Sequence, residues 1–234
     1  NADDAQMGSY LLRSPWAQVA RNNALLVLDG WLSSQFVNQL NGTTYGVMDP
    51  RIERITDKTV TGTYVGTRNG QGNVGGPNTV KDEVYISLNS PLSGDTSPLL
   101  IVTFAEMKFV EAEAALRSGD RARAYTAYLA AIRANMDKLG VLAANRDTYL
   151  VNPAVAVGAP ALSLDLIFKE KYMVTYLNPE AWNDARRHDY KYKGFTLPLN
   201  AALPTFIRRV AYPNGETTKN GLNVPAEVPL STPL

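Results

Sequence analysis

The chain has 234 residues, of which 45% are hydrophobic and 19% are charged, and its formal net charge is +1. This composition is typical of a globular protein, and the near-zero charge argues against nucleic acid or an acidic membrane surface as a partner. The lack of cysteine excludes disulfides, thiolate metal sites and cysteine nucleophiles within these residues. No apolar run approaches the roughly 18 residues that a membrane-spanning helix needs.

The first hundred residues contain few regular patterns. Residues 1–30 show no clean period, so no element is predicted there, whereas residues 31–40 are typical of a short helix. Residues 59–97 are rich in Gly, Thr, Asn and Pro, which predicts a long loop region. Two short β-like runs are expected within it, at residues 59–65 and 83–88.

The middle of the chain predicts two helices folded against each other. Thr103 and Glu106 have the spacing of a capping box, which begins a helix, and Gly119 ends that helix. Asp120 then caps a second helix, which Gly140 ends. Because only a few residues join the two helices, they should lie antiparallel.

One face of each of these helices is expected to be buried. In the first helix the apolar residues at three- and four-residue steps are Phe104, Met107, Val110, Ala114 and Ala115. In the second they are Ala124, Tyr128, Ala131, Ile132, Met136 and Leu139. The spacing after the turn resembles the second half of a tetratricopeptide repeat, and such a repeat cannot bury its face alone. The hairpin therefore implies partner helices.

The last third of the chain predicts two more helices. Residues 145–160 read as a connection, after which Ser163 caps a helix over residues 164–177. Another helix should start at Pro179-Glu180, with proline in its first turn, and end in Arg186-Arg187-His188. Prolines spaced through the tail forbid long helices there.

Catalytic motifs are absent from the sequence. There is no G-x-S-x-G, H-E-x-x-H, Walker or EF-hand pattern. His188, the single histidine, has no nucleophile beside it, so a surface or structural role is favoured. Residues 70–75 spell G-x-G-x-x-G, but a strand-like run follows instead of the required helix, which favours a glycine loop. A pair of carboxylates for glycoside hydrolysis stays open as an alternative.

The aromatic and polar loop residues suit sugar recognition. Sugars stack their C–H faces on aromatic rings and bond their hydroxyl groups to amides and hydroxyls. The candidate ligand-binding residues, in or beside the irregular region, are Tyr45, Tyr64, Arg68, Asn69 and Tyr85. Each of them can instead anchor a turn or fill the core.

Five segments of the chain match, in the same order, the conserved pieces of one known family. They are residues 48–51 (MDPR), 64–66 (YVG), 104–141 (the helix pair), 166–190 (containing EAWNDARR) and 207–220 (containing RRVAYP). Together they resemble the SusD/RagB family of outer-membrane nutrient-binding lipoproteins, in particular its SusD-like branch. Five ordered matches are far more specific than any one alone.

The chain departs from this family at two positions and in length. Glu170 stands where the family usually has glutamine, and Lys191 where it usually has proline. Family members are much longer and begin with a lipidated cysteine. We therefore expect residues 1–234 to be the C-terminal part of one longer SusD-like domain.

The resemblance implies a mainly α fold, with tetratricopeptide-like helical hairpins packed with long irregular loops and minor β-strand. It also implies a surface-exposed outer-membrane protein, anchored by a lipid, that captures oligosaccharide, or peptide in some members. The partner would be a TonB-dependent SusC-like barrel, with no reaction catalysed, no cofactor and no metal. The motif residues that we expect to be structural are Glu180, Trp182, Arg186, Arg187, Arg208 and Arg209. The alternative from another class is a helical-repeat scaffold that binds a protein partner.

Overall fold

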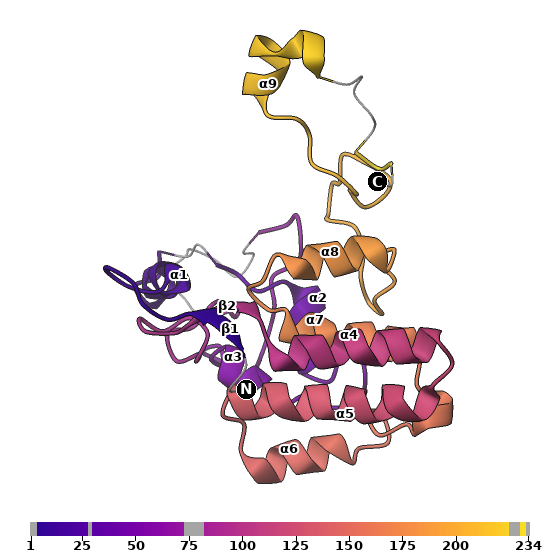
Figure 1. Cartoon of the computed structure of the whole chain (residues 1–234). Coiled ribbons are helices and arrows are strands. Elements are labelled where there is room, and N and C mark those ends of the chain that lie inside the picture. The colour runs from indigo at the N-terminus through magenta and orange to yellow at the C-terminus, as the bar shows by residue number, and fades with distance from the viewer. Residues whose placement is uncertain (1–3, 28–29, 73–81, 225–229, 233–234) are drawn as a thin grey trace.

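The computed structural model describes residues 4–27, 30–72, 82–224 and 230–232, and helices dominate it (Figure 1). The helices in this part are α1 (Pro15–Ala24), α2 (Ser34–Leu40), α3 (Ile52–Ile55), α4 (Phe104–Arg117), α5 (Arg121–Lys138), α6 (Ala143–Leu150), α7 (Leu164–Val174), α8 (Glu180–Arg187) and α9 (Asn214–Lys219). Short 3₁₀ turns lie at Ala159–Ala161 and Gly221–Asn223. One antiparallel pair, β1 (Ala5–Met7) and β2 (Leu99–Val102), forms a two-stranded sheet. The predicted fold class, mainly α with minor β, is confirmed.

The predicted helical hairpin is α4 followed by α5, and its capping residues act as expected. The Thr103 hydroxyl accepts a hydrogen bond from the backbone N–H of Glu106 at 3.1 Å, and Asp120 accepts one from Arg123 at 3.1 Å. Gly119 has a φ of +89°, which a glycine adopts without the steric cost that other residues pay. The two helices lie side by side along their length (Figure 1).

The prediction of the buried face was correct for α5 and largely wrong for α4. All six predicted residues of α5 are buried. In α4, however, Met107 is 53% exposed and Val110 is 42% exposed, and the buried apolar residues are Ala105, Phe109, Ala112 and Ala115. The sequence carries two apolar stripes on α4, and periodicity alone does not choose between them. The stripe with three alanines faces α5 and α7 because small side chains allow close approach.

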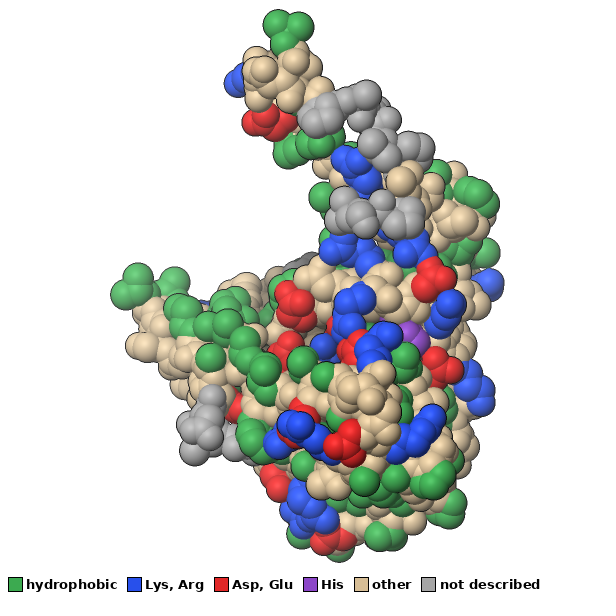
Figure 2. Space-filling view, turned by 45° about the vertical axis from the view of Figure 1, so that its right-hand side comes forward, with side chains coloured by type: hydrophobic (Ala, Val, Ile, Leu, Met, Phe, Trp, Pro, Cys, Tyr) green, Lys and Arg blue, Asp and Glu red, His purple; other side chains and the backbone are tan. Residues whose placement is uncertain are grey.

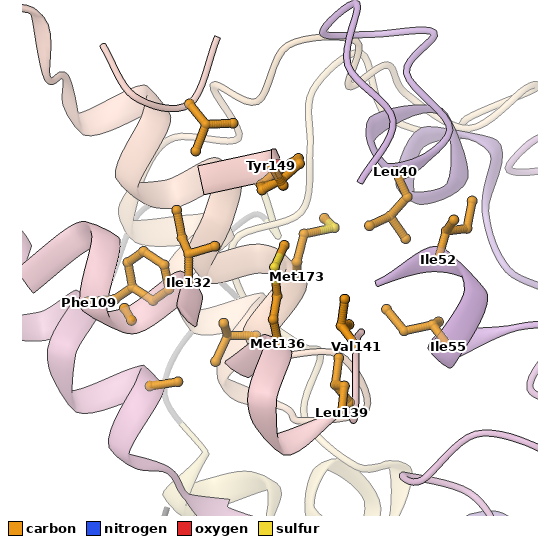
Figure 3. Packing of buried hydrophobic residues seen from close by; sticks show 14 of the residues in the cluster. Leu40, Ile52, Ile55, Phe109, Ile132, Met136, Leu139, Val141, Tyr149 and Met173 are labelled. Atoms are coloured by element: carbon orange, nitrogen blue, oxygen red, sulfur yellow. The ribbon is translucent and has the colours of Figure 1, made fainter. Parts of the chain in front are cut away.

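The core joins the hairpin to segments from both ends of the chain. Figure 3 shows Leu40, Ile52 and Ile55 from the first third packed towards Met136 of α5 and Met173 of α7. Ser163 caps α7 as predicted, accepting the N–H of Leu166 at 3.3 Å. The short early helices are therefore held by burial against the hairpin rather than by their own length.

The predicted β-like runs, residues 59–65 and 83–88, are not strands. The chain makes only isolated bridges there, between Trp31 and Tyr85 and between Ser33 and Thr67. The reason is that residues 31–33, predicted as helix, run extended between the two loop segments, and α2 begins only at Ser34. The loops therefore bridge to this short segment, and the backbone N–H of Val84 also donates to the carbonyl of Val65 at 2.8 Å, without a continuous strand forming.

Two further regions contain elements that sequence reasoning did not predict. Residues 145–160, predicted as a connection, contain most of α6, and residues 1–30 contain α1 and β1. No side-chain cap marks the start of α6, so its start carries no local signal. Its last two residues, Tyr149 and Leu150, are buried, and this packing supplies the stability that intrinsic helix propensity does not.

Residues 70–75, which spell the glycine fingerprint, lie only partly in the described structure, since residues 73–75 fall outside it. Gly70 has a φ of +79°, and a Cβ there would lie 2.5 Å from the carbonyl oxygen of Leu199. Glycine at this position therefore lets the loop approach the C-terminal tail closely. Along the described ranges, the structure has no helix both long enough and apolar enough to cross a membrane.

Candidate functional site

The five predicted ligand-binding residues lie in different surroundings. Tyr45 covers the ammonium groups of Lys169 and Lys193, whose nitrogens lie 5.0 and 5.5 Å from its ring centre. Tyr64 packs against the core, and Lys58 lies 5.9 Å from its ring centre.

The other three predicted residues differ in exposure and in their contacts. Arg68 is exposed, and the backbone carbonyl of Asn69 accepts the N–H of Leu199 at 2.8 Å. Tyr85 is only 5% exposed, and its ring meets Trp31 edge to face with 5.8 Å between ring centres. The role of these five residues in ligand binding remains a prediction. Tyr85 contacts Trp31, and Trp31 lines a more clearly formed cleft.

That site is a cleft of about 500 Å³ between α1, α2 and the end of α7. We call it the aromatic cleft, and its rings are Trp16, Trp31, Phe36, Tyr172 and Tyr176. Its polar side chains are Ser33, Thr175 and Asn178. A mostly apolar concave surface with a few placed polar groups is the usual form of a small-molecule site.

The first part of the chain places three of the rings. Trp16 lies in the first turn of α1, and the bridge to Tyr85 holds Trp31. The Ser33 hydroxyl accepts the N–H of Phe36 at 3.2 Å and so caps α2, which directs Phe36 inward. The cap fixes Phe36 and the bridge fixes Trp31, so this side of the cleft is held by the fold itself.

The end of α7 places the other two rings. Tyr172 and Tyr176 are four residues apart, and both contact Phe36, with ring centres at 5.6 and 5.2 Å. Leu177 then turns the chain with a φ of +61°, which is unfavourable for a residue with a side chain. The Asn178 side chain accepts the N–H of Glu180 at 2.9 Å and ties this turn to α8.

The cleft is electrically neutral, and no charged side chain is among its lining residues in the described chain. Burial raises the pKa of Tyr172 to about 12 and also raises the pKa of Tyr176, so both hydroxyl groups keep their protons at neutral pH. The Tyr176 hydroxyl oxygen is buried and has no hydrogen-bond partner among the described residues. The cleft offers stacking surfaces and neutral hydrogen-bonding groups, without a general acid or base.

His188 is buried in a separate place, which agrees with the predicted structural role. Its ring stacks on Phe168 with 4.1 Å between ring centres, and its Nε2 lies 3.4 Å from a carboxylate oxygen of Asp165. Burial lowers the pKa of His188, an effect that Asp165 opposes. Within the described ranges, no group of three or more His, Cys, Asp or Glu side chains is placed to hold a metal ion.

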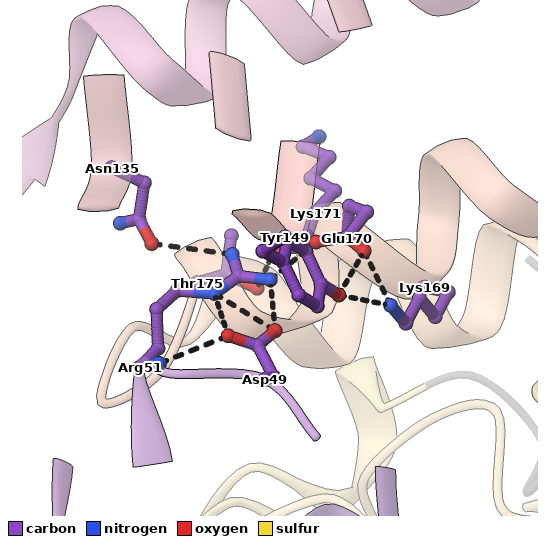
Figure 4. Close-up of polar contacts among 8 residues, drawn as sticks. All are labelled: Asp49, Arg51, Asn135, Tyr149, Lys169, Glu170, Lys171 and Thr175. Atoms are coloured by element: carbon purple, nitrogen blue, oxygen red, sulfur yellow. Dashed lines mark hydrogen bonds and ion pairs between the residues drawn. The ribbon is translucent and has the colours of Figure 1, made fainter. Parts of the chain in front are cut away.

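A second polar region includes residues of α7, and Figure 4 shows it. We call it the buried charge cluster, and it comprises Asp49, Arg51, Asn135, Tyr149, Lys169 and Glu170. Arg51 is fully buried, and its Nε lies 2.9 and 3.0 Å from the two carboxylate oxygens of Asp49. It also pairs with Glu170 and donates to the Asn135 side chain at 3.3 Å.

The charges in the cluster balance. Lys169 pairs with Glu170 and donates to the Tyr149 hydroxyl at 2.6 Å, and that hydroxyl donates to Glu170 at 2.8 Å. Burial alone would raise the pKa of Glu170, but Lys169 and Arg51 hold it below its usual value. Glu170, where the family usually has glutamine, is thus one of two carboxylates that neutralise two buried cations.

The residues expected to be structural join α8 to the tail and to α4. The Arg186 guanidinium lies 4.2 Å from the Trp182 ring centre and donates to the backbone carbonyl of Arg208 at 3.0 Å. Arg208 pairs in turn with Asp189, and Arg187 pairs with Glu113 of α4. Figure 2 shows Lys and Arg side chains gathered on this face, where the tail joins the helical body.

The side chains of Glu180 and Arg209 contact residues that are near them in the sequence. Glu180 is exposed and accepts a hydrogen bond from Asn183 at 2.9 Å, and the Arg209 guanidinium lies 5.3 Å from the Tyr212 ring centre. Beyond them, α9 stands away from the helical body (Figure 1), and all of its residues are exposed. The expectation that the six motif residues are structural remains a prediction, and these contacts are compatible with it.

A family model described as starch-binding and associating with the outer membrane matches residues 1–213. The chain belongs to the SusD-like family. SusD-like proteins are nutrient-binding proteins associated with the outer membrane, and they are not enzymes. Among curated proteins, none matches this sequence.

Solved structures share the fold at low identity. A SusD homologue from Bacteroides vulgatus superimposes with a TM-score of 0.70 at 20% identity, over 94% of this chain and 49% of that chain. A SusD homologue from Bacteroides fragilis superimposes with a TM-score of 0.70 at 18% identity, over 95% of this chain and 53% of that chain. A chitin-binding protein superimposes with a TM-score of 0.58 at 22% identity, over 80% of this chain and 44% of that chain. The SusD-like chain therefore spans about half the length of the solved structures that it matches.

Proposed function

We propose that this SusD-like chain captures oligosaccharide in its aromatic cleft without chemical conversion. The observation that supports this proposal is the lining of the cleft, which has five aromatic rings, neutral polar groups and no charged residue among those described. Aromatic faces bind the C–H faces of sugar rings, and the neighbouring hydroxyl and amide groups bind sugar hydroxyls. The family description, starch-binding, and the chitin-binding structural relative both support a sugar as the ligand.

The whole protein, in this proposal, delivers the captured sugar to a transporter. We take residues 1–234 as the C-terminal part of one SusD-like domain, surface-exposed and anchored by a lipid on an N-terminal cysteine outside this chain. The partner is a TonB-dependent SusC-like barrel. What supports this is the outer-membrane association of the family and the coverage of about half of its solved members.

Intrinsic fluorescence tests sugar capture directly, because two of the three tryptophans, Trp16 and Trp31, line the cleft. We expect maltohexaose or N-acetylchitohexaose to change the emission in a saturable way. Each should also raise the melting temperature, since a ligand at 100 times its Kd adds about 2.7 kcal/mol of stability. Trp31→Ala should weaken binding at least tenfold, whereas Trp182→Phe should keep the affinity, because Trp182 is not among the lining residues of the cleft. The absence of binding to any sugar in such a panel would contradict the proposal, and release of smaller sugars would favour a hydrolase.

A second candidate is a scaffold for a protein partner, and the exposed stripe of α4 favours it. Phe104, Met107 and Val110 line a groove of about 600 Å³ that is mostly apolar. Exposed apolar surface of this kind commonly marks a contact with another polypeptide. Met107→Glu should leave the free energy of unfolding within about 0.5 kcal/mol of wild type because the residue is exposed. Loss of a protein partner in this variant, with sugar affinity unchanged, would assign the groove to that second role.

A further inference from the structure

The aromatic cleft continues into a small recess between α4 and the end of α7. The recess has a volume of about 10 Å³, and it shares Trp16, Tyr176, Leu177 and Asn178 with the cleft. Its far wall includes Thr103 and Glu106. A space of this size holds about one water molecule or one hydroxyl group, so it does not admit a second sugar ring.

The charges around the cleft and recess disfavour an anionic ligand. Glu106 is the acid among the described lining residues of the recess. Lys171, a buried cation whose charge acts on Glu106, lies 2.7 Å from a carboxylate oxygen of Asp184 and is neutralised by it. A carboxylate on the ligand would therefore enter apolar surroundings without a positive partner. Burying an unpaired charge costs far more than burying a hydroxyl that finds a hydrogen bond.

The Tyr176 hydroxyl is a buried polar group in this region that has no hydrogen-bond partner among the described residues. Its oxygen is buried and makes no hydrogen bond within the described ranges, although the ring is held firmly by stacking on Phe36. Leaving a buried hydroxyl unpaired is unfavourable, and a ligand hydroxyl can supply the missing bond. The ring is therefore placed in advance, and the hydrogen bond is left for the ligand.

We propose that the aromatic cleft selects uncharged sugars over acidic ones, and that the Tyr176 hydroxyl binds a sugar hydroxyl at the mouth of the recess. This inference rests on the proposed function and names its ligand class. Stacking on the rings holds the sugar without regard to its charge. Selection against acidic sugars then comes from the absence of a cation among the described lining residues and from Glu106 in the lining of the recess.

Matched sugars test the charge selection by calorimetric titration of the full chain. Maltotriose and N-acetylchitotriose are each compared with the same sugar whose C6 hydroxymethyl groups are oxidised to carboxylates. We expect the neutral form of whichever sugar binds to bind at least tenfold more tightly than its oxidised form. Equal or tighter binding of the oxidised form overturns the inference while leaving oligosaccharide capture in place. Failure of both the neutral and the oxidised forms to bind overturns both proposals.

Two conservative variants test the role of Tyr176. Tyr176→Phe removes only the hydroxyl, and we expect about tenfold weaker binding of the neutral sugar with a melting temperature that is unchanged or higher. Tyr128→Phe is the matched control, because the Tyr128 hydroxyl is also buried without a described partner but lies in α5, outside the cleft. The control should keep the affinity. Unchanged affinity in Tyr176→Phe, with both variants folded, overturns the assignment of this residue.

Discussion

The buried charge cluster and the aromatic cleft both include residues of α7, and they treat polar atoms in opposite ways. Glu170 belongs to the cluster and Tyr172 to the cleft, and residues two apart on a helix point about 200° apart. In the cluster each charged group has an oppositely charged partner, and Arg51 contacts two carboxylates. In the cleft no charge lines the surface, and the Tyr176 hydroxyl has no partner among the described residues.

This difference separates residues that hold the fold from residues that meet a ligand. The cluster joins the loop before α3 to α5, α6 and α7 through bonds that are complete without any further molecule. A fully satisfied polar network has nothing left to offer a ligand, whereas an apolar surface with an unpaired hydroxyl has. Mutations in the two regions should therefore act on different measurements, stability for the cluster and affinity for the cleft.

Removing the central cation of the cluster should have the largest effect. Arg51→Leu leaves Asp49 facing no cation, and it leaves Glu170 with Lys169 alone in a buried site. We expect a loss of about 3–5 kcal/mol in the free energy of unfolding, because uncompensated buried charge is costly. Urea unfolding followed by circular dichroism measures it. Arg133→Leu is the control, since its ion pair with Asp147 is about half exposed and should contribute less than about 1 kcal/mol.

Glu170→Gln should produce a smaller loss that depends on pH. The pKa of Glu170 in the folded chain is lower than in the unfolded chain, where a glutamate titrates near ~4.3. The stabilisation from its charge is therefore present above that unfolded value and is lost as the pH falls through the folded pKa. We expect the variant to be less stable than wild type by about 1–3 kcal/mol at neutral pH.

The difference between wild type and Glu170→Gln should narrow as the pH is lowered towards 3. Unfolding curves at several pH values measure this trend. Glu53→Gln, a change at an exposed carboxylate, should stay within about 0.5 kcal/mol of wild type throughout. A Glu170→Gln deficit that stays constant with pH would mean that the loss comes from packing rather than from charge.

The elements that sequence reasoning placed well are those with local signals. The capped hairpin of α4 and α5 is one, and α7, with Ser163 at its start, is another. The fold class also followed from motifs spread along the chain. The predictions that failed concerned features that tertiary contacts determine. They are the stripe of α4 that faces inward, the start of α6, and the pairing of the loops with residues 31–33.

The aromatic cleft was not predicted, for a physical reason. Its rings come from residues 16 to 176, and three of the five have ordinary positions on helices, where an aromatic residue reads as core. A signal did exist in Tyr172 and Tyr176, two tyrosines one turn apart at a helix end next to Asn-Pro. Tyr85 was named as a ligand residue, and the structure places it beside Trp31 at the cleft wall. Which side chains meet across the core is information that spacing along the sequence does not carry.

The sharpest comparison uses two variants with small expected effects, Tyr149→Phe and Tyr176→Phe, because each removes a tyrosine hydroxyl from one of the two regions. The Tyr149 hydroxyl in the cluster accepts from Lys169 and donates to Glu170, whereas the Tyr176 hydroxyl in the cleft has no described partner. Tyr149→Phe should lower the free energy of unfolding by about 1–3 kcal/mol, since it leaves charged groups without a bond. Tyr176→Phe should leave it unchanged or raise it slightly. Thermal unfolding of the two variants without ligand measures both values, and a loss of similar size in each would mean that the Tyr176 hydroxyl is already satisfied in the free protein.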